Sequence, residues 1–397
     1  MNRKLLTATI LSMSLLTVMA GAAVAPALGA VREYFAEESP LLIQFVVSMP
    51  ALFIILTNLC FPLLCRLWRT RTIAIIGLVL YVVAGAGAFF VRSIVVLLAL
   101  RALLGVSVGM LMPLSTGLLA YYFRPEEMAR LMGLSAAMNQ MGGVVATLLA
   151  GILATISWNY AFLVYMIGLL ALVMVALYLP NEKLGVSQES KVESQKTATG
   201  MSKWTILRHF HPSVVGMLLL MTIFFVYPTN FALAGSSLGL GTAWVTTIMV
   251  GLDVVAFFAG LVFGQMMQRF RTAIKYFAPV GFFSGYLLLA LVPSLGGMIA
   301  GSALIGLANG VGVPYLNTIA SIKGGRESTT TVMPMLSAAL YLGQFISPLI
   351  VLPSASLFFC DIQSGVWLVA VVLSALFLLQ TFLTRRFHRL PPENSKS

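Results

Sequence analysis

Twelve apolar segments, each long enough to cross a lipid bilayer, constrain this chain more than any other feature of its sequence. Windows of about 19 residues place them near 5–30, 41–65, 73–91, 94–122, 131–156, 160–180, 213–235, 242–267, 273–292, 297–322, 329–352 and 364–384. A helix satisfies its own backbone hydrogen bonds, so it can cross lipid without a partner strand. The sequence therefore predicts an all-α polytopic membrane protein with twelve transmembrane helices.

Composition supports the same class. The chain is 59% hydrophobic and 9% charged over 397 residues, whereas soluble domains carry about 25% charged residues. A soluble fold of this length has too little interior to bury so much apolar surface.

The formal net charge of +12 is distributed unevenly along the segments. With both termini inside, nearly all lysines and arginines lie on the inner side, Arg32 and Arg92 lie outside, and Arg101 lies within a helix. This asymmetry follows the positive-inside rule. It predicts a multi-pass protein of a bacterial cytoplasmic membrane with both termini cytoplasmic. The basic charge is thus a topological signal, with attraction to anionic lipids as a side effect, and does not indicate a nucleic-acid partner.

The two halves of the chain form an internal repeat with an offset near 202. "RALLGVSVGMLMP" (101–113) aligns without gaps to "SALIGLANGVGVP" (302–314), and Pro26 corresponds to Pro228. The first segment resembles a secretory signal peptide, but its repeat partner predicts that it is retained as helix 1. We therefore expect two pseudo-symmetric six-helix bundles, with these bounds: 1–180 for the first bundle, 181–212 for a cytoplasmic linker containing a short interfacial helix at 203–210, and 213–397 for the second bundle with its tail.

Several motifs resemble those of the major facilitator superfamily of secondary transporters. The resemblance covers the two-times-six plan, the long central linker, the basic turn after the second helix and "RPEEMARLMG" (124–133). Arg101, Gly105 and Gly109 are similar to the helix-4 motif of drug/proton antiporter-like bacterial members. The resemblance implies a midplane site between two bundles that opens alternately to either side. Helices 1, 4, 7 and 10 would line the cavity, and helices 2, 5, 8 and 11 would form the bundle interface.

The chain departs from these motifs at three places. In "FPLLCRLWRTR" (61–71), Cys65 stands where the family has an aspartate, and the second copy, "GQMMQRFRT" (264–272), has Gln268 there. Helix 5 lacks the glycine-proline pair of the antiporters. The family's account of how these loops control conformation is therefore not carried over. The conformational-loop candidates are Arg66, Arg69, Arg71, Gly264 and Arg269.

Asp253 lies in "VGLDVVAFFAG" (250–260), about 17 Å deep in the eighth helix. A charge at that depth is costly and is expected to have a function. Two interpretations stay open: a hydrogen-bonded structural anchor, or a carboxyl that gains and loses the coupled proton. Arg101 is the second proton-coupling candidate. The two could pair directly or with a substrate between them.

Further polar residues lie on helices expected to face the cavity or the bundle interface. Each is either a helix–helix hydrogen-bonding group or a substrate contact, and together they suit a moderately hydrophobic or weakly charged substrate. These cavity candidates are Asn139, Gln140, Tyr227, Asn230, Asn309, Tyr315, Asn317 and Gln344; the helix-packing candidates are Gly105, Gly109, Gly306 and Gly310.

Other chemistries have little support in the sequence. No GxxxxGK[ST] phosphate loop is present, and the three cysteines and three histidines do not gather into a metal site. We expect no cofactor, no metal and no enzymatic activity, with a membrane-embedded enzyme as the remote alternative. The sequence favours a monomeric secondary transporter that exports small amphipathic compounds in exchange for protons. Proton-coupled uptake of a small organic anion is the alternative.

Overall fold

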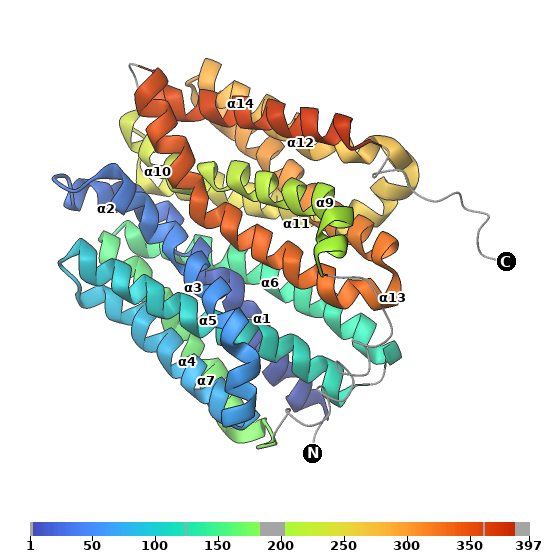
Figure 1. The fold of residues 1–397 in the computed structure, drawn as a ribbon. Helices are drawn as coiled ribbons and strands as arrows, with labels where there is room; N and C mark the ends of the chain where they lie inside the picture. The colour runs from blue at the N-terminus through green and yellow to red at the C-terminus, as the bar shows by residue number, and fades with distance from the viewer. Residues whose placement is uncertain (1–2, 124, 183–202, 360–361, 386–397) are drawn as a thin grey trace. The chain divides into compact units, whose positions relative to one another are not determined.

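The computed structural model describes residues 3–123, 125–182, 203–359 and 362–385, and within these ranges it contains helices and turns but no strands (Figure 1). The first half contains α1 (Arg3–Ala22), η1 (Ala25–Ala27), α2 (Leu28–Tyr34), α3 (Pro40–Leu67), α4 (Thr70–Gly87), η2 (Ala88–Phe90), α5 (Ile94–Tyr122), α6 (Pro125–Ala154), η3 (Trp158–Ile167) and α7 (Gly168–Tyr178). The second half contains α9 (Lys203–Phe224), α10 (Val226–Ser237), α11 (Thr242–Phe270), η4 (Arg271–Tyr276), α12 (Phe277–Leu291), α13 (Leu295–Phe358) and α14 (Ile362–Leu383).

These elements provide twelve helices that are long and apolar enough to cross a membrane within the described residues. The predicted all-α class with twelve spans is therefore confirmed. Two details differ from the sequence-based expectation. Residues 203–210 belong to α9 and do not form a separate interfacial helix, and the tenth and eleventh spans share one helical stretch, α13. At 64 residues, α13 would be about 96 Å long if straight, so it must cross twice, as Leu295–Lys323 and Val332–Phe358.

Contacts group the chain into two compact units. The first contains Met1–Ser194 and Pro228–Val250, and the second contains Gln195–Tyr227 and Gly251–Ser397. The predicted linker falls largely on 183–202, outside the described residues. The bundle boundaries at 180 and 213 stay a prediction.

Three contacts hold 228–250 in the first unit. The Gln44 side-chain amide donates to Oδ1 of Asn230 at 2.7 Å. A Cβ atom at Gly29 would lie 2.5 Å from Oγ of Ser236, and Gly151 lies directly against Thr246. Small residues thus let the ends of spans 7 and 8 approach spans 1 and 5 closely.

The repeated glycines perform the same packing in both halves. On α5, Gly105 lies against the Pro50 carbonyl of α3, with no room for a side chain. On α13, Gly306 lies against Leu252 of α11, where a Cβ would approach the carbonyl oxygen to 2.5 Å. Leu252 lies within one residue of the position related to Pro50 by the repeat. Spans 4 and 2 therefore pack as spans 10 and 8 do.

The second glycine of each pair behaves in the same way. A Cβ at Gly109 would lie 3.0 Å from the Ile54 carbonyl oxygen and 2.6 Å from Cβ of Thr57, and Gly310 lies directly against the Ala256 carbonyl. All four predicted packing glycines, Gly105, Gly109, Gly306 and Gly310, therefore lie at close backbone approaches between helices.

Another repeated glycine contact joins spans 5 and 1, and spans 11 and 7. Gly142 of α6 lies against the carbonyl of Leu15, and at Gly343 of α13 a Cβ would lie 2.6 Å from the carbonyl oxygen of Leu218. The two halves thus reuse one set of helix-packing contacts, as expected from a duplicated unit.

We predict that Gly109→Ala destabilises the folded protein, because its methyl group would overlap α3. Overpacking of this kind costs about 1–3 kcal/mol, which should lower the melting temperature by several degrees in detergent. Gly117→Ala on the same helix is the matched control, since nothing lies within 4 Å of its Cβ position. Equal melting temperatures for the two variants would contradict the packing.

Candidate transport site

Arg101 is fully buried in the first unit, with 0% of its surface exposed. Its guanidinium donates from Nε to the Val46 carbonyl at 3.0 Å and from Nη2 to the Ala20 carbonyl at 3.2 Å. It also donates from Nη1 and Nη2 to the hydroxyl of Tyr165, at 2.9 and 2.7 Å. The planar fork of arginine suits such divergent acceptors, whereas a lysine ammonium would not reach them all.

Aromatic rings enclose the same guanidinium. Its Cζ lies 5.4 Å from the ring centre of Phe162 and 5.3 Å from that of Tyr165, both within cation–π range. The Tyr165 hydroxyl donates in turn to the Ala20 carbonyl at 2.9 Å. Arg101 therefore joins spans 1, 2, 4 and 6 of a single unit. Tyr165 was not singled out from the sequence, because only the fold brings it to Arg101.

The second half replaces this arrangement with neutral groups. Ser302, at the position equivalent to Arg101, shares a 2.7 Å hydrogen bond with the hydroxyl of Tyr227. Tyr227 is 1% exposed and lies at the start of α10. The hydroxyl of Tyr286 donates to the carbonyl of Ile223 at 2.6 Å, and its ring stacks on Trp367.

Asp253 lies half-buried on α11 of the second unit, near enough to Tyr227 to interact electrostatically with its hydroxyl. Tyr227 and Ser302 therefore form a hydroxyl pair beside the break between α9 and α10, and Asp253 acts on this pair electrostatically. Within the twelve described spans, the other acid is Glu33, which is exposed and one residue from a span end. The structure thus supplies Asp253 with a hydroxyl neighbourhood that the sequence did not reveal.

The proposed proton-coupling residues lie in different units, Arg101 in the first and Asp253 in the second. Every hydrogen bond described above for Arg101 stays within its own unit. The two alternatives from the sequence, a direct pair or a substrate between the two residues, both stay untested.

Several cavity candidates make hydrogen bonds between helices. Asn139 accepts from Thr17 at 2.8 Å, and Asn230 accepts from Gln44. Oδ1 of Asn309 and Oε1 of Gln44 are buried acceptors without a hydrogen-bond donor. Gln44 was not singled out from the sequence, because no polar pattern marks it there.

The other cavity candidates differ in exposure. Tyr315 lines a small pocket together with Lys275 and Gln380, among α13, η4 and α14. Gln344 is buried, Asn317 is half-buried and Gln140 is exposed. Their part in a substrate cavity stays a prediction.

The basic turn after span 2 is tied to the end of span 6. The backbone N–H of Thr70 donates to the Glu182 carbonyl at 2.9 Å, and Arg71 donates to the Ala176 carbonyl. The hydroxyl of Tyr122 donates to Oε2 of Glu182 at 3.1 Å, and burial together with this bond raises the pKa of Tyr122. The backbone carbonyl of Glu182 thus binds Thr70 at the turn, while its carboxylate accepts from Tyr122 at the end of α5.

The remaining loop candidates lie at the surface. Arg66, Arg69, Gly264 and Arg269 are exposed.

Among the described residues, no three His, Cys, Asp or Glu side chains lie close enough to hold a metal ion.

A family model described as Major Facilitator Superfamily matches residues 10–348. The chain belongs to this superfamily. It is therefore a transporter and not an enzyme, and its twelve spans make it a multi-pass membrane protein. No curated protein matches the chain.

Solved structures of superfamily transporters share the fold. A bacterial homolog of the human lysosomal transporter Spinster, in an inward-facing and occupied conformation, is 13% identical with a TM-score of 0.81, covering 98% of this chain and 99% of that one. The nucleoside transporter NupG is 13% identical with a TM-score of 0.71, covering 98% and 100%. A D-xylose-proton symporter is 16% identical with a TM-score of 0.69, covering 94% and 96%. At these identities the likeness shows the fold alone.

We predict that Arg101→Ala impairs stability and transport more than Ser302→Ala, although the two positions are related by the repeat. The alanine would leave the buried Val46 carbonyl and the Tyr165 hydroxyl without the donors that Arg101 supplies, and would remove one of the two donors to the Ala20 carbonyl, at a cost of about 3 kcal/mol. Arg101→Lys should rescue little, because one ammonium cannot span the acceptors. Thermal unfolding in detergent measures this, and equal losses for Arg101→Ala and Ser302→Ala would contradict it.

Proposed function

We propose that this superfamily member exports small amphipathic compounds in exchange for protons, with Asp253 as the proton-carrying group. The observation that carries the proposal is the position of Asp253. Within the described spans it is the one carboxyl away from a helix end, and it lies beside the hydroxyl cluster of Tyr227 and Ser302.

The surroundings of Asp253 suit a proton-transfer role. An apolar setting favours the protonated carboxyl, while access to water or hydrogen-bond donors favours the carboxylate. The Tyr227 hydroxyl, which shares a hydrogen bond with Ser302, interacts electrostatically with Asp253. Opening toward either side of the membrane would change this balance, so proton release becomes coupled to conformation.

The surroundings of Arg101 weigh against the alternative, uptake of a small organic anion. That function needs a cation exposed to the substrate, and the cation deep within the described spans is Arg101. Arg101 is instead 0% exposed and donates to Val46, Ala20 and Tyr165. Binding an anion there would break several of these bonds, whereas an amphipathic compound has no such requirement.

The first experiment separates gradient-driven flux from passive exchange in proteoliposomes. The probe is a compound selected from small amphipathic molecules because it raises the melting temperature of the purified protein. We predict that Asp253→Asn retains binding and exchange of this probe but loses its pH-driven accumulation, falling to the level of protein-free vesicles. Asparagine keeps the shape of the protonated acid but has no proton to release.

Glu33→Gln is the matched control, since it makes the same chemical change at an exposed carboxyl near a span end. It should accumulate the probe as the unmodified protein does. Intact pH-driven accumulation by Asp253→Asn would remove Asp253 from the mechanism. A requirement for ATP would overturn secondary transport itself.

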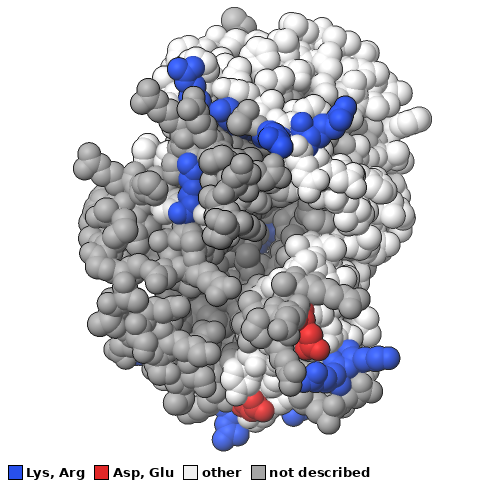
Figure 2. Space-filling model, turned by 90° about the vertical axis from the view of Figure 1, so that its right-hand side faces the viewer, with Lys and Arg blue, Asp and Glu red and all other residues white. Residues whose placement is uncertain are grey.

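We further propose that both termini are cytoplasmic in a bacterial inner membrane. Figure 2 supports this orientation, because the described residues on the face where α14 ends include several lysines and arginines. Arg269, Arg271, Lys275 and Arg385 all lie at helix ends on this side of the second unit.

Cysteine labelling in intact cells tests the orientation. After Cys60, Cys65 and Cys360 are replaced by serine, a membrane-impermeant maleimide should label Ala36→Cys directly. It should label Ser194→Cys and Ser395→Cys only after permeabilisation. The opposite pattern would reverse the proposed topology.

A further inference from the structure

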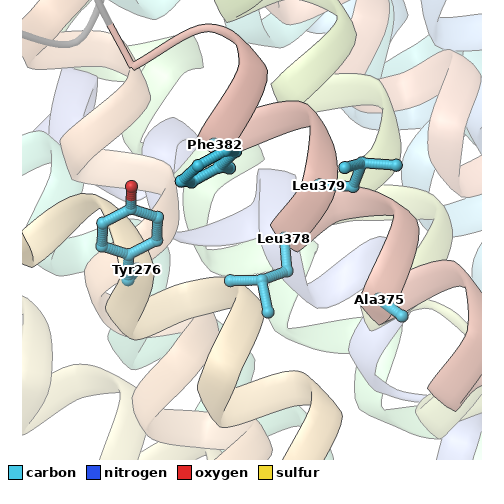
Figure 3. A pocket seen from close by; sticks show the side chains of 5 residues that line it. All are labelled: Tyr276, Ala375, Leu378, Leu379 and Phe382. Atoms are coloured by element: carbon cyan, nitrogen blue, oxygen red, sulfur yellow. The ribbon is translucent and has the colours of Figure 1, made fainter.

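A pocket of about 400 Å³ lies on the surface of the second unit, between η4 and α14. Its lining residues are Tyr276, Ala375, Leu378, Leu379 and Phe382 (Figure 3). The α14 residues are spaced three or four apart, so they form one face of the helix. Ala375, Leu379 and Phe382 are exposed, as expected of a surface that meets lipid. The pocket is therefore an apolar groove along the last span.

Two cations lie at one end of this groove. Nζ of Lys275 lies 5.1 Å from the ring centre of Tyr276, and Cζ of Arg385 lies 5.0 Å from that of Phe382. Tyr276 and Phe382 both line the groove, and Figure 3 shows their rings at the same end of it. Lys275 and Arg385 thus place positive charge beside the two rings, at the end of the groove where α14 ends.

Lys275 differs from an ordinary surface lysine, because only 8% of its surface is exposed. It lines the small pocket next to the groove with Gln380 and Tyr315. Among the residues of the second unit whose side chains the structure describes, the one acid is Asp253, which lies in the middle of α11. The end of the groove is therefore basic in character.

We propose that this groove binds one anionic phospholipid. An acyl chain would lie along Ala375, Leu378 and Leu379. The phosphate would lie against the exposed Arg385, within reach of the Tyr276 hydroxyl, and the buried Lys275 beside the Tyr276 ring would add positive charge. An apolar groove with cations at one end matches the two parts of such a lipid. With the proposed orientation, the lipid belongs to the inner leaflet. The site does not depend on the transport mechanism, because it lies on the last span and excludes Asp253.

The test compares lipids that have the same acyl chains and different headgroups. The purified protein is titrated with phosphatidylglycerol, phosphatidylcholine or inorganic phosphate alone, and bound lipid is counted by native mass spectrometry. We expect one tightly bound phosphatidylglycerol, weaker binding of phosphatidylcholine and no stabilisation by phosphate. Arg385→Ala should weaken phosphatidylglycerol binding about fivefold, since one interfacial cation is removed.

Two tryptophan variants separate the groove from the general lipid surface. Ala375→Trp should fill the groove and displace the bound lipid, whereas Val372→Trp, at an exposed position of α14 outside the groove, should not. Arg92→Ala controls for loss of an exposed cation elsewhere. Equal affinity for the two lipids, stabilisation by phosphate alone, or unchanged binding in both Arg385→Ala and Ala375→Trp would overturn the proposal. Because the readout is lipid binding, it is independent of whether Asp253 carries protons.

Discussion

Backbone hydrogen bonding in an apolar medium is the constraint on which the rest of this structure depends. Lipid offers no donors or acceptors, so every interruption of a helix must be compensated by the protein. Spans 1 and 7 are both interrupted, at η1 with Pro26 and before α10 with Pro228. Side-chain donors reach the carbonyls beside both interruptions. Tyr165 donates to Ala20 in the first half, and Tyr286 donates to Ile223 in the second.

This compensation explains why the largest polar groups cluster where they do. Arg101 reinforces the first interruption by donating to the Ala20 carbonyl while bound to Tyr165. At the second interruption, the hydroxyl pair of Tyr227 and Ser302 takes the equivalent position. Because Ser302 stands where the first half has Arg101, the second unit has no buried arginine at this position. A carboxyl at Asp253 can therefore lie nearby without being held in a permanent ion pair with a buried arginine of its own unit.

The charged residues of the spans thus serve different purposes. Arg101 makes all its described hydrogen bonds within one unit and strengthens the packing of four spans. Asp253 lies half-buried beside hydroxyl groups that suit either of its protonation states. Lys275 and Arg385 lie at the membrane boundary, where an arginine or lysine can contact lipid phosphate at much lower desolvation cost than at the midplane.

The sequence alone determined the all-α class, the twelve spans and the duplication, because hydropathy and the repeat are properties of the linear chain. It also identified the glycines at Gly105, Gly109, Gly306 and Gly310, since a missing side chain permits close helix approach in any such bundle. It did not reveal that the tenth and eleventh spans share the helical stretch α13, because the segment that joins them, "KGGRESTTT" (323–331), is polar and contains two glycines, a composition typical of a loop.

Only the tertiary structure decided what the polar residues contact. Tyr165 meets Arg101, Gln44 meets Asn230, and Glu182 meets Thr70 across 64 to 186 residues of chain. No local pattern encodes such pairs, because a hydrogen bond requires a donor and an acceptor from distant parts of the chain to come within about 3 Å of each other. The rotation and packing of the helices decide which donors and acceptors meet, and both depend on the whole fold.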